Sequence, residues 1–176
     1  MKILTTTKLL LIASATALLM ASAAHANNTR TGDMEVTAQV RGTCLINSVG
    51  DMPFGLLDYR ASEAPADATA VVQLRCVNNI NYHLYADMGA RGNRTLEGDG
   101  HTLAYELYTD SGYSTVLGTD TTGGTISGSG AGMGIPNMIE RTIYGRILGA
   151  DINALANSLA DEVSLSDTVV VTLEFN

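Results

Sequence analysis

Few side chains of this sequence stand in a pattern that catalysis or metal binding needs. His83 and His101 have no partner at ligand spacing, such as His-x-x-x-His or Cys-x-x-Cys, and no Gly-x-Ser-x-Gly elbow accompanies them. The carboxylates occur singly, which is typical of a solvated acidic surface. A secreted hydrolase would need two of them to converge in a cleft, and spacing does not show that. We therefore expect no catalytic residue, no cofactor and no metal.

The glycine-rich stretch "GGTISGSGAGMG", residues 123–134, resembles a phosphate-binding loop only in composition. It fits neither Gly-x-Gly-x-x-Gly nor a loop that ends in Gly-Lys-Ser/Thr. We expect a flexible loop between strands.

The first 26 residues predict an export signal. Lys2 and Lys8 precede the hydrophobic run "LLLIASATALLMASAA", and "AHA" ends a small-x-small cleavage site at Ala26. Cleavage leaves 150 residues, enough for one domain with its own core. The remaining 8 arginines against 18 acidic residues give a net charge of −10 with histidine neutral, so nucleic acid is excluded as a partner.

Cys44 and Cys76 form an even pair in a chain expected to reach an oxidising compartment. This predicts a disulfide, and the alternative is two buried free thiols. In "ATAVVQLRC", residues 68–76, the alternation places Cys76 on the same face as the apolar residues, so its side chain is expected to point into the core.

Short alternating runs separated by turn residues predict an all-β protein. Each run puts its apolar residues on one face, as expected for a sandwich. The runs are "ATAVVQLRC", "NYHLYAD", "HTLAYELYTD", "IERTIYGRI" and "TVVVTLEFN". One segment differs: "DINALANSLADEV", residues 151–163, spaces its apolar residues for a short helix or an ordered loop, with Asp151 as a possible cap.

A further alternating run stands just after the expected cleavage site. Met34, Val36, Ala38 and Val40 share one face of an extended segment. Two interpretations remain open: an ordinary first strand of a self-sufficient domain, or a strand that completes another molecule. The second interpretation builds a fibre, because such a head-to-tail contact does not close.

Several motifs spread over residues 36–175 carry a resemblance to a known family. They are "VTAQVRGTC" ending at Cys44, "PFG" at 53–55, "VQLRC" ending at Cys76, "RTLEGDGHTLAYELYTD" at 94–110, "IYGRI" at 143–147 and "SDTVVVTLEF" at 166–175. In their order and spacing the chain resembles the spore coat protein U domain family, the pilins of archaic (Csu-type) chaperone-usher fimbriae.

The resemblance implies an incomplete immunoglobulin-like antiparallel β-sandwich that lacks its last strand. By position it implies a donor strand carrying Met34, Val36, Ala38 and Val40, and the family's disulfide between Cys44 and Cys76. It also implies an acceptor groove and chaperone-binding edge that present Val169, Val171, Leu173 and Phe175. The expected parts are a signal peptide (1–26), a donor segment (27–40) and the pilin domain (41–176).

The resemblance further implies a structural subunit that polymerises by donor-strand exchange into surface pili for adhesion and biofilm formation. Its expected partners are identical or related pilin subunits, a periplasmic chaperone and an outer-membrane usher, and its expected location is the cell surface, reached through the periplasm. The alternative is a monomeric secreted β-sandwich, either a binding module or a spore- or cell-coat protein.

Overall fold

The computed structural model describes residues 29–59 and 62–176. They belong to two units, which divide between Ala38 and Gln39. In the first unit, residues 29–38 form no helix or strand and are exposed. The expected signal peptide, residues 1–26, lies outside the described residues. The second unit contains every helix and strand that the structure describes.

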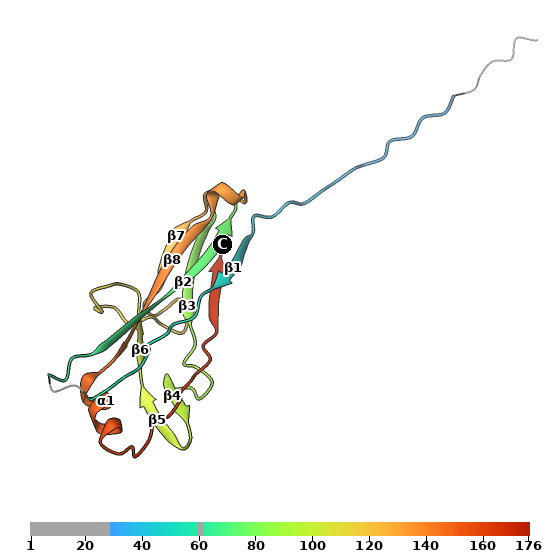
Figure 1. Cartoon of the computed structure of the whole chain (residues 1–176). Helices are drawn as coiled ribbons and strands as arrows, with labels where there is room; N and C mark the ends of the chain where they lie inside the picture. The colour runs from blue at the N-terminus through green and yellow to red at the C-terminus, as the bar shows by residue number, and fades with distance from the viewer. Residues whose placement is uncertain (1–28, 60–61) are drawn as a thin grey trace, which may run out of the picture. The chain divides into compact units, whose positions relative to one another are not determined.

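One sheet of the second unit has four strands in the spatial order β1-β2-β8-β6, each antiparallel to its neighbour (Figure 1). These strands are β1 (Cys44–Val49), β2 (Ala66–Cys76), β8 (Ile139–Ile147) and β6 (Glu106–Tyr108). The register of β1 shifts between Ile46 and Ser48, so Ile46 lies opposite Leu74 and Val49 lies opposite Val72. This bulge turns both Ile46 and Val49 toward the face on which Leu74 and Val72 are buried.

The second sheet has three antiparallel strands in the order β7-β3-β9. They are β7 (Ile126–Ser129), β3 (Asn81–Ala86) and β9 (Val171–Phe175). Tyr82, Leu84 and Ala86 of β3 are fully buried and form a core with the inward residues of β2 and β8. Two sheets around one core confirm the predicted all-β, immunoglobulin-like sandwich.

The expected run from 101 to 110 divides at Tyr105. Its first half is β5 (His101–Ala104), which forms a hairpin with β4 (Thr95–Gly98), and its second half is β6 in the large sheet. The loop prediction for residues 123–134 is wrong in part, because β7 lies within this stretch and pairs with β3. The sequence did not indicate this strand because serine and glycine occupy most of its positions, so its two faces do not differ in hydrophobicity.

The segment that predicted a short helix overlaps α1 (Gly149–Ala156), which begins two residues earlier than expected. Residues 157–163 form no helix. Leu148, not Asp151, is the N-cap residue, and Asp151 lies in the first turn. A Cβ atom on Gly149 would lie 1.9 Å from the backbone oxygen of Glu63, so the helix can approach that backbone only with glycine here. A 3-10 turn, η1 (Ile135–Asn137), precedes β8. No helix among residues 29–59 and 62–176 is long and apolar enough to cross a membrane.

A buried arginine ties the core to its loops. Arg94 is 2% exposed and forms an ion pair with Glu106. Its guanidinium also donates to the backbone oxygens of Leu117 (2.7 Å), Ala86 (3.2 Å) and Asp87 (3.4 Å). These acceptors occupy the donors of the planar guanidinium group, which is what allows a charge to be buried here.

We predict that Arg94→Ala lowers the free energy of unfolding by about 3–5 kcal/mol, because it leaves several buried acceptors without a donor. Urea unfolding of the mature chain, followed by circular dichroism, measures this. Arg91 is the matched control: it pairs with Glu97 at the surface, and Arg91→Ala should cost less than about 1 kcal/mol. Equal losses for the two variants would contradict the role assigned to Arg94.

The predicted disulfide is present between Cys44 and Cys76, which lie opposite each other at the start of β1 and the end of β2. It closes a loop of about 33 residues, which the chain-entropy relation equates with roughly 3–4 kcal/mol of stability. We predict that thiol labelling of the unfolded, unreduced protein detects no thiol, and that reduction lowers the urea midpoint. One label or more per chain before reduction would contradict the bridge in the exported protein.

Candidate functional site

The edges of the two sheets meet along β1 and β9. β1 is the edge strand of the four-stranded sheet and β9 is the edge strand of the three-stranded sheet. The two strands lie side by side (Figure 1) without a ladder between them in the described part of the chain. Because β1 and β9 are not hydrogen-bonded to each other, no paired strand of the described chain covers the inward side chains along these two edges.

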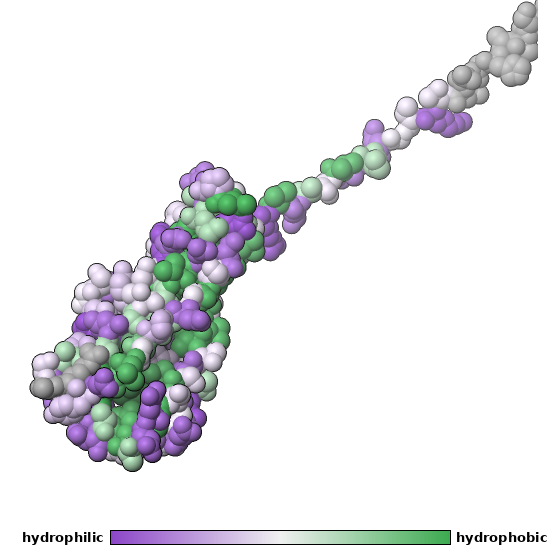
Figure 2. Space-filling model, viewed as in Figure 1, coloured by the Kyte–Doolittle hydropathy of each residue, from purple (hydrophilic) through white to green (hydrophobic). Residues whose placement is uncertain are grey.

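Inward residues at this edge are therefore exposed. Ile46 and Val49 face inward on β1 and are 37% and 46% exposed, and Phe175 on β9 is 39% exposed. Their cross-strand partners Leu74, Val72 and Tyr82 are fully buried. Figure 2 shows apolar surface on this side of the domain. The sandwich is thus open where β1 and β9 meet.

A groove enters the core at this opening, and we call it the β1–β9 groove. It has a volume of about 390 Å³. Val49 forms one bank, Val169 and Val171 form the other, and the floor consists of core residues of β2, β6 and β8: Ala70, Leu107 and Ile143. The groove is shaped to take apolar side chains from the solvent side.

A wider cavity of about 980 Å³ continues from the groove. Residues 51–59 form one wall, and the opposite wall comes from the end of α1 and residues 161–167. Asp51, Met52, Phe54, Leu96 and Asp167 line both spaces, so the two join there. Met52 and Phe54 of this wall pack over Gly145 of β8. A Cβ atom on Gly145 would lie 2.2 Å from the Met52 sulfur, so the wall can contact the sheet this closely only because the residue is glycine.

The junction of groove and cavity is acidic. Asp51 stands on the β1 side and Asp167 on the β9 side, and Asp58, Asp161 and Glu162 line the wider cavity. No arginine, lysine or histidine is among the described residues that line either space. A partner segment that ends here therefore meets a negative potential.

Hydrogen bonds hold the bank that leads into β9. One oxygen of Asp167 accepts from the backbone N–H groups of Ala90 (3.0 Å) and Thr168 (2.8 Å), and the other accepts from the Tyr105 hydroxyl at 2.6 Å. The backbones of Glu97 and Ser166 exchange two further hydrogen bonds. The β4–β5 hairpin and Tyr105 thereby fix this bank in place.

Burial, and then the hydrogen bond to Asp167, raise the pKa of Tyr105 above its ordinary value of 10.0. A raised pKa contributes stability that is fully present below the unfolded pKa, near 10, and is lost as the pH rises above that value. The contact between Tyr105 and Asp167 is therefore intact at neutral pH.

The sequence-predicted residues lie as follows. Val169 and Val171 line the groove, whereas Leu173 and Phe175 continue the same inward face beyond it, opposite Leu84 and Tyr82. Met34, Val36 and Val40 are 82%, 81% and 94% exposed, and residues 29–43 form no strand in the isolated chain. The assignments to a donor and an acceptor remain predictions.

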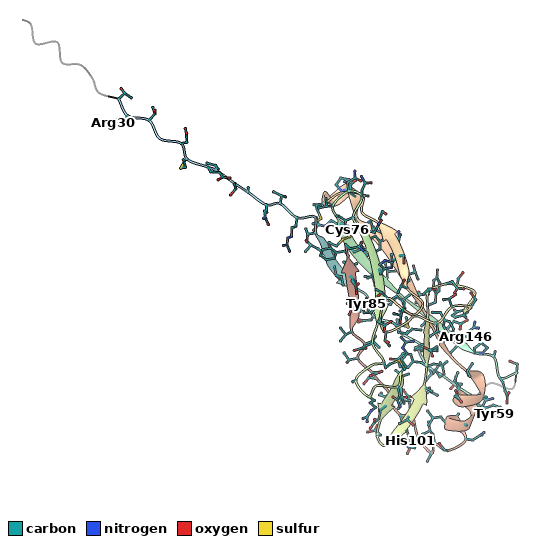
Figure 3. The ribbon with its side chains drawn as sticks, turned by 180° about the vertical axis from the view of Figure 1, so that it is seen from behind. Arg30, Tyr59, Cys76, Tyr85, His101 and Arg146 are labelled. Carbon is teal, nitrogen blue, oxygen red and sulfur yellow. A yellow bond between two sulfur atoms is a disulfide. The ribbon has the colours of Figure 1, made fainter. Side chains whose placement is uncertain are left out.

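The two histidines lie apart from the groove. The Nδ1 atom of His83 lies 2.9 Å from the Ser127 hydroxyl. His101 is the first residue of β5 and lies at the opposite end of the domain from Cys76 (Figure 3). Among the described residues, no group of three histidine, cysteine or carboxylate side chains could hold a metal ion.

Sequence reasoning missed the β1 side of the groove. Ile46 and Val49 were hidden by the bulge, which breaks the alternation of β1. Met52, Phe54 and Leu57 are the half-buried residues of the adjoining wall, and the "PFG" motif was the available signal for them. The pairing of Tyr105 with Asp167 joins residues 62 positions apart and left no local pattern.

A model of the Spore Coat Protein U domain matches residues 30–172, which is most of the chain. The chain belongs to this family. No curated protein matches it. Among solved structures it is similar to a chain in the crystal structure of the CsuC–CsuE chaperone–tip adhesion subunit pre-assembly complex from archaic chaperone-usher Csu pili of Acinetobacter baumannii.

That similarity has a TM-score of 0.47 at 19% sequence identity, and it covers 77% of this chain. The chain spans about 40% of the length of the matched chain. Family membership therefore rests on the match to the domain model, which covers the β1–β9 groove and ends within β9.

We predict that Tyr105→Phe lowers the free energy of unfolding by about 1–2 kcal/mol at pH 7, because Asp167 loses a hydroxyl donor. The advantage of the wild type over the variant should shrink as the pH rises above about 10. Urea unfolding at pH 7 and pH 11 measures both effects. Tyr59→Phe, at an exposed tyrosine, is the control and should change neither value; a pH-independent difference for Tyr105→Phe would contradict the assignment.

Proposed function

We propose that this protein is a non-catalytic structural subunit of a surface pilus and that it polymerises by donor-strand exchange. In this reaction, residues 27–40 of one copy enter the β1–β9 groove of the next copy. The observation that supports the proposal most directly is the open edge of the sandwich, where inward apolar residues of β1 and β9 are exposed.

The groove and the N-terminal segment are complementary in hydrophobicity and in backbone hydrogen bonding. The groove offers apolar walls beside an unpaired strand edge, and the segment offers apolar side chains on every second residue. Successive inward side chains of an extended strand lie about 6.5–7 Å apart, so four of them match the inward positions from Val169 to Phe175, which include β9 and the two residues before it. Backbone hydrogen bonds supply affinity in this mode of recognition, and the alternate side chains supply specificity.

Burial supplies the driving force. Met34, Val36 and Val40 are almost fully exposed in the isolated chain. Fully burying side chains of this size stabilises a contact by roughly 1.5–3 kcal/mol each. The same insertion covers Ile46, Val49 and Phe175, so both partners lose exposed apolar surface.

The geometry of the contact implies a fibre. Donor and acceptor are different surfaces of the same chain, so each copy that receives a segment still presents its own. Growth continues for as long as copies with open grooves are supplied. The product is a linear polymer in which every sandwich is completed by its neighbour.

An open groove also implies that other proteins protect the subunit before it is assembled. Exposed apolar edges lead to aggregation, so a periplasmic chaperone is expected to cover the groove until an outer-membrane usher admits the subunit. The assembled pili would lie on the cell surface and serve adhesion and biofilm formation. The rival function is a monomeric secreted binding or coat protein.

We predict that deletion of residues 27–40 abolishes polymers while chaperone binding persists, because the groove remains and the donor is lost. Unboiled gel electrophoresis of the exported protein, produced together with its chaperone and usher, shows polymers as a ladder. A ladder from the deleted chain would contradict the donor assignment. An intact chain that remains monomeric on sizing chromatography and forms no ladder when produced together with its chaperone and usher would favour the rival function.

Two point variants test whether insertion depends on the apolar inward face of the segment or on any change to its sequence. Val36→Asp puts a charge where burial is required and should abolish the ladder. Thr37→Asp introduces the same side chain one residue later, on the face expected to remain in solvent, and should retain the ladder. Loss of the ladder in both variants would show that the alternation does not decide insertion.

A further inference from the structure

We propose that the β1–β9 groove receives the apolar segment of a second copy and not the chain's own segment, because the link formed by residues 41–43 prevents self-insertion. This inference rests on the proposed function and specifies its partner. In the isolated chain Val40 is 94% exposed although its own groove is open. The structural basis is the shortness of the link and the way in which its end is held.

Two contacts hold the link where it joins β1. The disulfide fixes Cys44 to Cys76 at the end of β2. The backbone oxygen of Thr43 accepts a hydrogen bond from the N–H of Val77 at 3.0 Å, which extends the pairing of β1 and β2 by one residue. The link therefore starts from a fixed point on the sandwich.

This fixed point lies at the end of the sandwich where β9 finishes. A short turn joins Cys76 to β3, which begins at Asn81. Asn176, the residue after β9, donates its backbone N–H to the oxygen of Asn81 at 3.2 Å. Figure 3 labels Cys76 at this end. β1 thus begins where β9 ends, and the two edge strands run in opposite directions.

A second copy can insert its segment antiparallel to β9, which continues the antiparallel pattern of β3 and β9. The four inward residues of the segment then face the four inward residues from Phe175 to Val169, and Val40 lies opposite Val169. Val49, the last residue of β1, lines the groove at the same place. This contact is therefore at the end of β1 farthest from Cys44.

The chain's own segment cannot enter in this direction. It would run beside β1 and parallel to it, and parallel neighbouring strands need a connection of about a dozen residues or more. The link has three. Distance gives the same answer: β1 has six residues, so Val49 lies about 16 Å from Cys44. A fully extended link covers at most about 14 Å from Val40 to Cys44, with no length left for turning.

The remaining route is a hairpin in which the segment folds back along β1. A two-residue turn at Arg41 and Gly42 pairs Val40 with Thr43. Thr43 is exposed and precedes the buried Cys44, so this pairing turns the apolar face of the segment away from the core. The turn types that suit such a hairpin also need a positive φ at Arg41, which residues other than glycine rarely adopt.

A three-residue turn restores the correct face and fails at Thr43. It pairs Val40 with Cys44, whose side chain is buried. The third residue of such a turn adopts the left-handed conformation and is usually glycine. Here the third residue is Thr43, a β-branched residue that strongly disfavours positive φ, and the glycine is one position too early. Thr43 would also lose its hydrogen bond to Val77.

The first test lengthens the link in the full exported chain, produced together with its chaperone and usher. Ten glycine and serine residues inserted between Arg41 and Gly42 give a flexible connection that spans about 20 Å. The chain's own segment then competes at a millimolar effective concentration, so the ladder on unboiled gels should weaken roughly tenfold and a monomer stable without chaperone should appear. The same insertion between Asn28 and Thr29 is the control and should keep the wild-type ladder.

Cysteine pairs show which copy supplies the segment. Val40→Cys with Val169→Cys should give a covalent ladder that survives boiling without reductant, because directly opposite cross-strand positions lie within reach of a disulfide. With the lengthened link, the same pair should give a bridged monomer. Ala38→Cys with Ile46→Cys reports the hairpin and should give no bridged monomer with the unchanged link. Mass spectrometry of the bridged peptides separates these bridges from the native one.

The outcomes distinguish this inference from the proposed function. A bridged monomer from either pair with the unchanged link would overturn the inference while assembly by strand exchange stands. With the lengthened link, an unchanged ladder, or a weakened ladder without the bridged monomer, would also overturn it. Ladders that survive deletion of residues 27–40, with no bridge between positions 40 and 169 in any variant, would overturn the proposed function itself.

Discussion

The structure depends on one unmet requirement: an apolar residue that faces inward from an edge strand must be covered by a neighbouring strand. At β1 and β9 this requirement is not met by the described residues of the second unit. Ile46, Val49 and Phe175 share a face with buried partners and are nevertheless exposed. The open edge shapes the groove, and the proposed assembly is a means of closing it with a strand from another copy.

A disulfide and two sets of polar contacts stabilise the domain beside this open edge. The disulfide anchors the start of β1 to β2. The buried guanidinium of Arg94 joins β6 to the end of β3 and to the backbone at Leu117, and the contact between Tyr105 and Asp167 fixes the backbone that leads into β9.

The sequence by itself determined the class of the fold, the inward faces of β2, β3, β8 and β9, and the apolar face of residues 34–40, because alternation is a local signal. It also determined the pairing of the two cysteines, because an even pair in an exported chain predicts a disulfide. Only the tertiary structure decided that the β1 side is open, that α1 begins at Gly149, and that Tyr105 meets Asp167. A bulge, a close backbone approach and a long-range hydrogen bond leave no periodic pattern. They depend on which segments the folded chain brings together.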